Sequence, residues 1–374
     1  MGSVLFDIGS RIVLAGVPGS SKCAFRSFNV EPRNVNYVSS NNANSPSFPP
    51  FYEVNDSSLT DEQRRVVLSS LLEDPVSSKV AEIYSRDTGY LSWGQQLPQV
   101  ISNILVESLL LAPKNLKAIV IESIFMSLQD KFIIEKSLFM KLGFRSITWL
   151  PEPIMESIAA NTNDSIVVHL GWSTSVVTII SDLRIINSRE INKFTGCILH
   201  YKIIETLVSL MSSIKGLESL LSKTSCFNLV ENFIQNACYV GGSEFQGDEF
   251  ELIPGVSIPN RIRHEVLEEL ITTSNVVPSI LSEISNSSID LRSTLIENIV
   301  FAGGLSNIPG LKSKILEGIR LSSLYPNPSA LLSLGSWAGA SIYYSSLHKD
   351  DLKKLSSKRG QTKDSFLASY TKHF

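Results

Sequence analysis

The feature that most constrains this chain is a pattern that occurs twice. Residues 4–14 read VLFDIGSRIVL, and residues 166–177 read IVVHLGWSTSVV. In each segment an apolar strand continues through a polar residue, an apolar residue and a glycine into a second strand, which is typical of a β-hairpin. Matching hairpins this far apart indicate a weak internal repeat. The sequence therefore predicts two halves of related fold.

Strands and helices alternate over much of the remaining chain, which favours an α/β fold. Runs rich in β-formers predict strands over residues 117–122, 146–150 and 298–302, and a hairpin over 249–258. Helical spacing of apolar residues and capping signals predict helices over 60–73, 97–111, 129–142, 154–160, 311–319 and 330–347. Beyond residue 349 the chain is rich in Lys, Asp and Ser, and it is expected to be a solvated tail.

Composition excludes several classes of protein. The 33 Lys and Arg against 36 Asp and Glu give a formal charge of −3, so no nucleic-acid surface is expected. The longest weakly polar run, residues 165–180, is shorter than the roughly 20 residues of a membrane helix, which predicts no membrane insertion. The four cysteines contain no CxxC pair, and the start MGSVLFDIG lacks a signal-peptide pattern. A reducing compartment, the cytosol or nucleus, is expected.

A glycine at a hairpin tip is suited to phosphate binding. Successive backbone N–H groups in such a bend form a nest that holds an anion without any side chain. Glycine is favoured because it adopts positive φ and has no Cβ to block the phosphate. Asp7, just before the first tip, is placed to hold a hydrated Mg²⁺ beside the phosphates. Ordinary hairpins use the same residues, so this motif alone does not distinguish the two.

Six segments resemble, in order and spacing, those of actin and the actin-related proteins. They are DIGSRIVLAG (7–16), ILVESLLLAP (104–113), AIVIES (118–123), NACYV (236–240), ENIVFAGGLSNIPG (297–310) and GSWAGASI (335–342). The resemblance covers nearly all of the chain. It implies the actin-like ATPase fold, which has two related lobes, each with a mixed sheet flanked by helices. A cleft between the lobes is expected to hold ATP or ADP with Mg²⁺ as a structural cofactor.

The resemblance also implies four subdomains. Subdomain 1 is expected to comprise residues 1–28, 86–159 and 335–374. A small, divergent subdomain 2 comprises residues 29–85. Subdomain 3 comprises residues 160–194 and 272–334, and subdomain 4 comprises residues 195–271.

By the same resemblance, two phosphate loops contribute to the cofactor site. Asp7, Gly9, Ser10 and Arg11 correspond to the first loop, with Asp7 also at the metal. Gly171 corresponds to the second loop.

Further cofactor-binding residues are implied elsewhere in the chain. Glu152 falls where actin has the glutamine that orients the attacking water. Gln235 stands on the adenine side in place of a glutamate. Gly303, Gly304 and Leu305 are expected to lie along the adenosine.

The second loop departs from the family's pattern. The family has an Asp and then a Gly-Asp-Gly tip, whereas this chain has His169 and then Gly171-Trp172-Ser173. A neutral imidazole orients metal-bound water poorly, and losing a positioned acid or base lowers a rate by about 10²–10⁴-fold. Leu14 and Ser333 also replace lysines. Nucleotide binding is expected to survive and efficient hydrolysis is not, so no catalytic residue is assigned. Taken alone, His169 also fits a hydrogen-bonded core histidine.

Residues 117–151 resemble the branch of the family found at the pointed end of dynactin. Residues 29–85 contain no recognisable counterpart of the actin loop that inserts into the next filament subunit. The resemblance therefore implies a cytoplasmic, cytoskeletal subunit that caps a short actin-like filament in support of dynein-driven transport. Its partners would be the actin-related filament subunits and other dynactin pointed-end proteins. Two alternatives stay open: a nuclear scaffold subunit of a chromatin remodeller, and an active ATPase or sugar-type kinase of the same fold.

Overall fold

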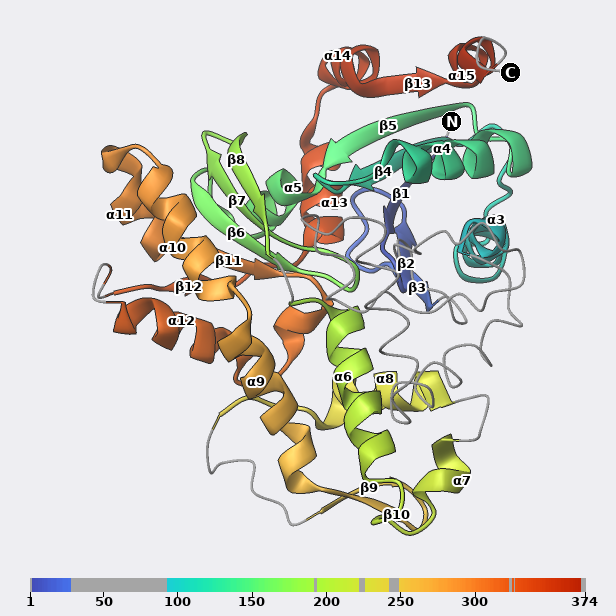
Figure 1. Ribbon diagram of the computed structural model, residues 1–374. Coiled ribbons are helices and arrows are strands. Elements are labelled where there is room, and N and C mark those ends of the chain that lie inside the picture. The colour runs from blue at the N-terminus through green and yellow to red at the C-terminus, as the bar shows by residue number, and fades with distance from the viewer. Residues whose placement is uncertain are drawn as a thin grey trace, which may run out of the picture.

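The computed structural model describes residues 2–27, 93–191, 194–221, 226–241, 249–322, 325 and 327–370. Its strands form two mixed sheets and one separate hairpin, and helices cover the faces of the sheets (Figure 1). The predicted α/β class, with mixed sheets flanked by helices, is confirmed at this level. The helix predicted over residues 60–73 and the small subdomain predicted over 29–85 lie outside the described residues.

The first sheet, sheet A, has the strand order β13-β5-β4-β1-β2-β3. Its strands are β1 (Ser3–Ile8), β2 (Ile12–Gly16), β3 (Ala24–Ser27), β4 (Lys117–Glu122), β5 (Ser146–Pro151) and β13 (Gly360–Thr362). The first three strands form an antiparallel meander, and β4 and β5 continue the sheet parallel to β1. The short strand β13 adds antiparallel to the outer edge of β5.

The second sheet, sheet B, has the strand order β12-β11-β6-β7-β8. Its strands are β6 (Ser165–Leu170), β7 (Ser175–Ser181), β8 (Arg184–Glu190), β11 (Ile299–Ala302) and β12 (Ala330–Leu331). Here too the first three strands form an antiparallel meander. β11 runs parallel to β6, and β12 runs parallel to β11.

Apart from β13, the two sheets have the same strand order and the same strand directions. The first hairpin of each meander also closes in the same way. Gly9 donates its N–H to the carbonyl of Ile12 at 3.0 Å, and Gly171 donates its N–H to the carbonyl of Thr174 at 3.1 Å. The internal repeat predicted from the two hairpins therefore extends to the topology of both sheets. In this correspondence Asp7 and His169 are equivalent, since each precedes the tip glycine by two residues.

Two helices connect the sheets by crossing from one to the other. α5 (Glu152–Ala159) follows a strand of sheet A but packs against β6 and β7 of sheet B. α13 (Ser336–Ser346) follows a strand of sheet B but packs against β1 and β4 of sheet A. The two helices pack tightly on each other, because a Cβ at Gly339 would lie 1.8 Å from the carbonyl oxygen of Met155.

The alternation of side chains along the strands fixes which residues face these two helices. In β1, Val4 and Phe6 belong to the core beneath α3 and α4, whereas Leu5 packs with Trp337 of α13. In β6, Val167 lies on the side of α5. Asp7 lies on the same face of β1 as Leu5, and His169 lies on the same face of β6 as Val167. Both polar residues consequently face the paired helices between the sheets.

The remaining helices surround these sheets and build a helical region beyond sheet B (Figure 1). They are α3 (Trp93–Asn103), α4 (Leu128–Lys136), α6 (Gly196–Ser209), α7 (Leu217–Leu221), α8 (Cys226–Ala237), α9 (Glu265–Thr273), α10 (Val276–Asn286), α11 (Ile289–Glu297), α12 (Leu311–Leu321), α14 (Lys349–Arg359) and α15 (Lys363–Tyr370). The separate hairpin consists of β9 (Glu249–Ile253) and β10 (Val256–Pro259).

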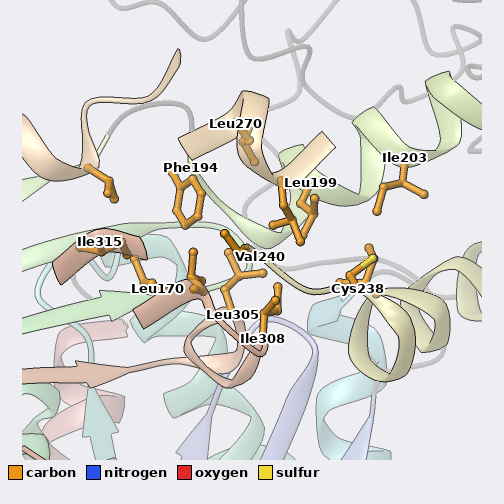
Figure 2. Packing of buried hydrophobic residues seen from close by; sticks show 14 of the residues in the cluster. Leu170, Phe194, Leu199, Ile203, Cys238, Val240, Leu270, Leu305, Ile308 and Ile315 are labelled. Atoms are coloured by element: carbon orange, nitrogen blue, oxygen red, sulfur yellow. The ribbon is translucent and has the colours of Figure 1, made fainter. Parts of the chain in front are cut away.

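The helical region and sheet B share one core. Figure 2 shows Leu170 at the end of β6 and Leu305 after β11 packed with Leu199 of α6, Leu270 of α9 and Val240. The loop that follows β11 is therefore held by apolar burial. No described helix is both long and apolar enough to cross a membrane.

Several predicted elements were wrong. The helix predicted over residues 330–347 is strand β12 followed by a loop and α13, because Gly335 adopts φ of +87° just before the helix begins. The tail beyond residue 349 is folded: it forms α14, β13 and α15, and Phe366 is 2% exposed. The helices predicted over 97–111 and 129–142 are confirmed over most of their length, and each ends in a π-helical turn. Strand β8 was not predicted.

Candidate functional site

The tips of the two equivalent hairpins touch each other. The Oγ atoms of Ser10 and Ser173 are 2.7 Å apart, within hydrogen-bond distance. Ser10 follows the tip glycine of sheet A, and Ser173 belongs to the tip of sheet B. The two sheets are thus joined directly at the place where the sequence predicted two phosphate loops.

Arg11 makes the second connection between the sheets. Its side chain is 5% exposed and lies over the ring of Phe227, with its guanidinium carbon 4.8 Å from the ring centroid. Nε donates to Oε1 of Glu231 at 3.1 Å, and Nη2 donates to the other carboxylate oxygen and to Asn228 Oδ1 at 3.4 Å. Because all three partners lie on α8, a residue of the first hairpin is bound to the helical region beyond sheet B.

Trp172 also lies over this arginine, next to Phe227. Its ring centroid is 5.4 Å from the Arg11 guanidinium carbon, in the range of a cation–π interaction. Gly196 makes room for the indole, since a Cβ there would lie 2.9 Å from it. His200 packs against the same indole and shares a hydrogen bond with the carbonyl of Phe227 at 2.9 Å. Burial lowers the pKa of His200 to about 3, so this neighbour of Arg11 is neutral.

Asp7 lies at the equivalent position on the inner face of sheet A. Ser336, the first residue of α13, donates its hydroxyl to Oδ2 of Asp7. The partner is 329 residues away in the sequence, so only the crossing of α13 onto sheet A brings it to Asp7. Asp7 also contributes to the charge around His169.

His169 lies among carboxylates. Nδ1 is 2.8 Å from Oε1 of Glu156 and 3.7 Å from Oε1 of Glu152, both on α5. Burial lowers the pKa of His169, but the charges of Glu152 and Glu156 outweigh it and raise the pKa to about 10. With this pKa the imidazole of His169 is protonated at pH 7. The alternative interpretation of His169 as a hydrogen-bonded histidine is consistent with its contact to Glu156.

The same three residues have donor atoms within 4.8 Å of one another, an arrangement that can hold a metal ion. Glu156 is 1% exposed, and its second carboxylate oxygen has no hydrogen-bond partner. The proton on His169 already supplies a positive charge between the carboxylates. The imidazolium therefore offsets one of the two carboxylate charges of the cluster. Glu156 was missed from the sequence, although its spacing of four from Glu152 places both on one helix face.

The remaining predicted residues are divided between the loop after β11 and α8. Gly303 has φ of +80° and lies so close to β6 that a Cβ would be 2.3 Å from the carbonyl oxygen of Leu170. Gly304 has open space around it, whereas Leu305 is 7% exposed and belongs to the core. Gln235 is exposed on α8. Asp7, Ser10, Arg11 and Glu152 thus meet between the sheets, while Leu305 and Gln235 have other surroundings.

The side chains of Ser10 and Ser173, as placed, leave no room for a phosphate between their hydroxyls. A phosphate that accepted hydrogen bonds from two hydroxyls would hold their oxygens about 4 Å or more apart, since each bond is about 2.7 Å long. The Oγ atoms of Ser10 and Ser173 are only 2.7 Å apart.

Compared with known protein families, the chain matches no family model.

Proposed function

We propose that this chain is an actin-related structural subunit that ends a short actin-like filament, as at the pointed end of dynactin. One observation carries the proposal. Two sheets of equal strand order present equivalent hairpins to each other, and the tips of these hairpins are in direct contact. This arrangement fits the six sequence segments that resemble the actin-related proteins, and it brings the two sheets into contact.

The charges between the sheets favour assembly over catalysis. Arg11 is committed to Glu231, and His169 is committed to Glu156. A group that is protonated and paired with a carboxylate does not accept a proton from water at neutral pH, so His169 is no general base. The alternative of an active ATPase finds no support in these residues. Measured release of phosphate from ATP at actin-like rates would revive it.

Recovery of partners tests the proposal. The tagged chain is isolated from cells at its native level, and bound proteins are identified by mass spectrometry. We expect actin-related filament subunits and other dynactin pointed-end proteins, in the cytoplasm. Recovery of chromatin-remodelling ATPases instead would replace this proposal with the nuclear scaffold.

A pair of glycine variants gives a second test of the proposal together with its matched control. Gly339→Ala changes the crossing of α5 and α13 without adding or removing charge. It should reduce recovery of all partners together, because it disturbs the unit that joins the sheets. Gly94→Ala, in α3, adds the same methyl group next to a side chain, 3.1 Å from Cγ2 of Ile133, and should leave recovery unchanged.

A further inference from the structure

We propose that the two sheets are held together by an internal clasp, consisting of Ser10, Arg11, Trp172, Ser173 and Glu231, in place of a bound nucleotide. The inference goes beyond the proposed function, because it concerns what occupies the space between the sheets whatever assembly the chain joins. It also replaces the expectation of ATP or ADP with Mg²⁺ as a structural cofactor.

The hairpin tips provide the first argument. Backbone N–H groups at two tips can surround a phosphate only if the tips are separated by the width of that group. In this chain the hydroxyls of Ser10 and Ser173 are 2.7 Å apart and bond to each other. A phosphate bound between these hydroxyls would have to break this bond. The two serines therefore make the contact that a phosphate makes when it bridges two loops.

Arg11 provides the second argument. A free arginine at a loop tip would attract phosphate, but this guanidinium bonds to both carboxylate oxygens of Glu231. Glu231 is 14% exposed on its side chain, so displacing it would leave a largely buried carboxylate next to an incoming anion. The clasp thus satisfies the arginine and excludes a second negative group.

Trp172 provides the third argument. The indole lies at the tip of the second hairpin, where the first hairpin has Ser10, and it covers the guanidinium of Arg11 at 5.4 Å. Phe227 lies over the same guanidinium at 4.8 Å. Two neighbouring aromatic rings therefore pack against the cation, whose side chain is 5% exposed. A small residue at position 172 would remove one of these two contacts.

Two carboxylates next to the hairpins already contact protein groups. Asp7 accepts a hydrogen bond from Ser336, and Glu156 is 2.8 Å from Nδ1 of His169. A divalent ion beside Asp7 would face the side chain of His169 across the same space. Protein groups thus contact each other on both inner faces.

The first test measures nucleotide in the purified wild-type chain. The protein is isolated without added nucleotide, denatured in acid, and the extract is analysed by chromatography for ATP and ADP. Its melting temperature is then measured with and without saturating Mg-ATP. We expect no adenine nucleotide in the extract and no change in melting temperature, because a ligand that binds only the folded state would raise it. Stoichiometric nucleotide, or a clear rise with Mg-ATP, would overturn the clasp.

The second test breaks the clasp in steps. Arg11→Gly and Glu231→Gln should each lower the melting temperature. The double variant should lower it by less than the sum of the two single effects, because both changes remove the same ion pair. Ser173→Ala is a milder change that removes the hydroxyl bonded to Ser10. It should increase amide hydrogen exchange in both hairpins while the protein stays folded. Additive effects of the two charge variants, or unchanged exchange in Ser173→Ala, would contradict the inference.

A surface arginine serves as control. Arg184 is 4.0 Å from Asp182, and both side chains are at least 80% exposed. Arg184→Gly should leave the melting temperature and the hairpin exchange unchanged. These measurements use the isolated chain, so they fail or succeed independently of partner recovery: nucleotide in the extract would reject the clasp and leave the filament-end proposal standing.

Discussion

The close crossing of α5 and α13 gives a quantitative prediction for Gly339→Ala. The added Cβ would lie 1.8 Å from the carbonyl oxygen of Met155 and 3.1 Å from Cβ of Ala159. A carbon and a carbonyl oxygen normally approach to about 3.3 Å, as in Cα–H···O contacts. The helices must therefore separate by more than an ångström. A gap of about 0.5–1 Å already removes a quarter to a half of the dispersion attraction between packed atoms.

Overpacking of this kind costs about 3 kcal/mol, the upper part of the usual range, because the obstacle is backbone. Alanine gains about 1 kcal/mol over glycine in helix propensity. We expect a net loss of about 2 kcal/mol in the free energy of unfolding, measured by urea denaturation followed by circular dichroism. Gly94→Ala, whose neighbour is a side chain that can move, should change stability by less than half as much. Equal midpoints for Gly339→Ala and the wild type would refute the close crossing.

Three further predictions concern buried groups. Burial raises the pKa of Glu135 to about 7 although Lys131 opposes it, so the folded chain holds an extra proton between pH 4.5 and 7. The contribution of this proton to the free energy of unfolding is fully present below pH 4.5 and falls by about 3 kcal/mol as the pH rises through 7. Glu135→Gln should remove this pH dependence, which urea denaturation at a series of pH values measures. His169, whose pKa rises from 6.5 to about 10, stabilises the fold fully below pH 6.5, and this contribution should decline towards pH 10 in the wild type but not in His169→Gln. Phe366→Ala should cost about 3 kcal/mol or more and expose the last helix to proteolysis, since its ring packs at 5.4 Å from Phe139.

The outcomes that contradict these predictions differ. Parallel stability curves for the wild type and Glu135→Gln would mean that the carboxyl has an ordinary pKa. A His169→Gln curve that tracks the wild type from pH 6.5 to 9 would place the imidazole outside the influence of Glu152 and Glu156. Unchanged protease resistance in Phe366→Ala would show that the last helix is held by contacts other than this ring. Leu128, which is 86% exposed, provides the control: Leu128→Ala removes an apolar side chain that packs against little.

Parts of the fold followed directly from local sequence. The predicted strand over residues 117–122 coincides with β4, and both glycine-tipped hairpins formed where the pattern occurred. Strand alternation and a glycine tip act over a few neighbouring residues, so they are readable without tertiary information. The failures were also local in origin: apolar residues after position 330 resembled a helix, but Leu331 pairs with Val300 in sheet B instead.

The contacts of the candidate site, in contrast, depend on the tertiary structure. The sequence placed Asp7, Ser10 and Arg11 at one hairpin tip and suggested phosphate as their partner. Their partners in the fold are Ser336, Ser173 and Glu231, at least 163 residues away. No periodicity links positions so far apart, because such contacts depend on how packed elements approach one another.

Local sequence by itself determined where the strands run, where the chain turns and which residues stand at the two tips, because these follow from backbone conformation and alternation. Tertiary structure alone decided what those residues do. The crossing of α5 and α13 brings Glu156 to His169 and Ser336 to Asp7. The charges of the neighbouring carboxylates then favour the imidazolium form of His169 in spite of burial. Glu231 on α8 pairs with Arg11, so the arginine connects the first hairpin to the helical region.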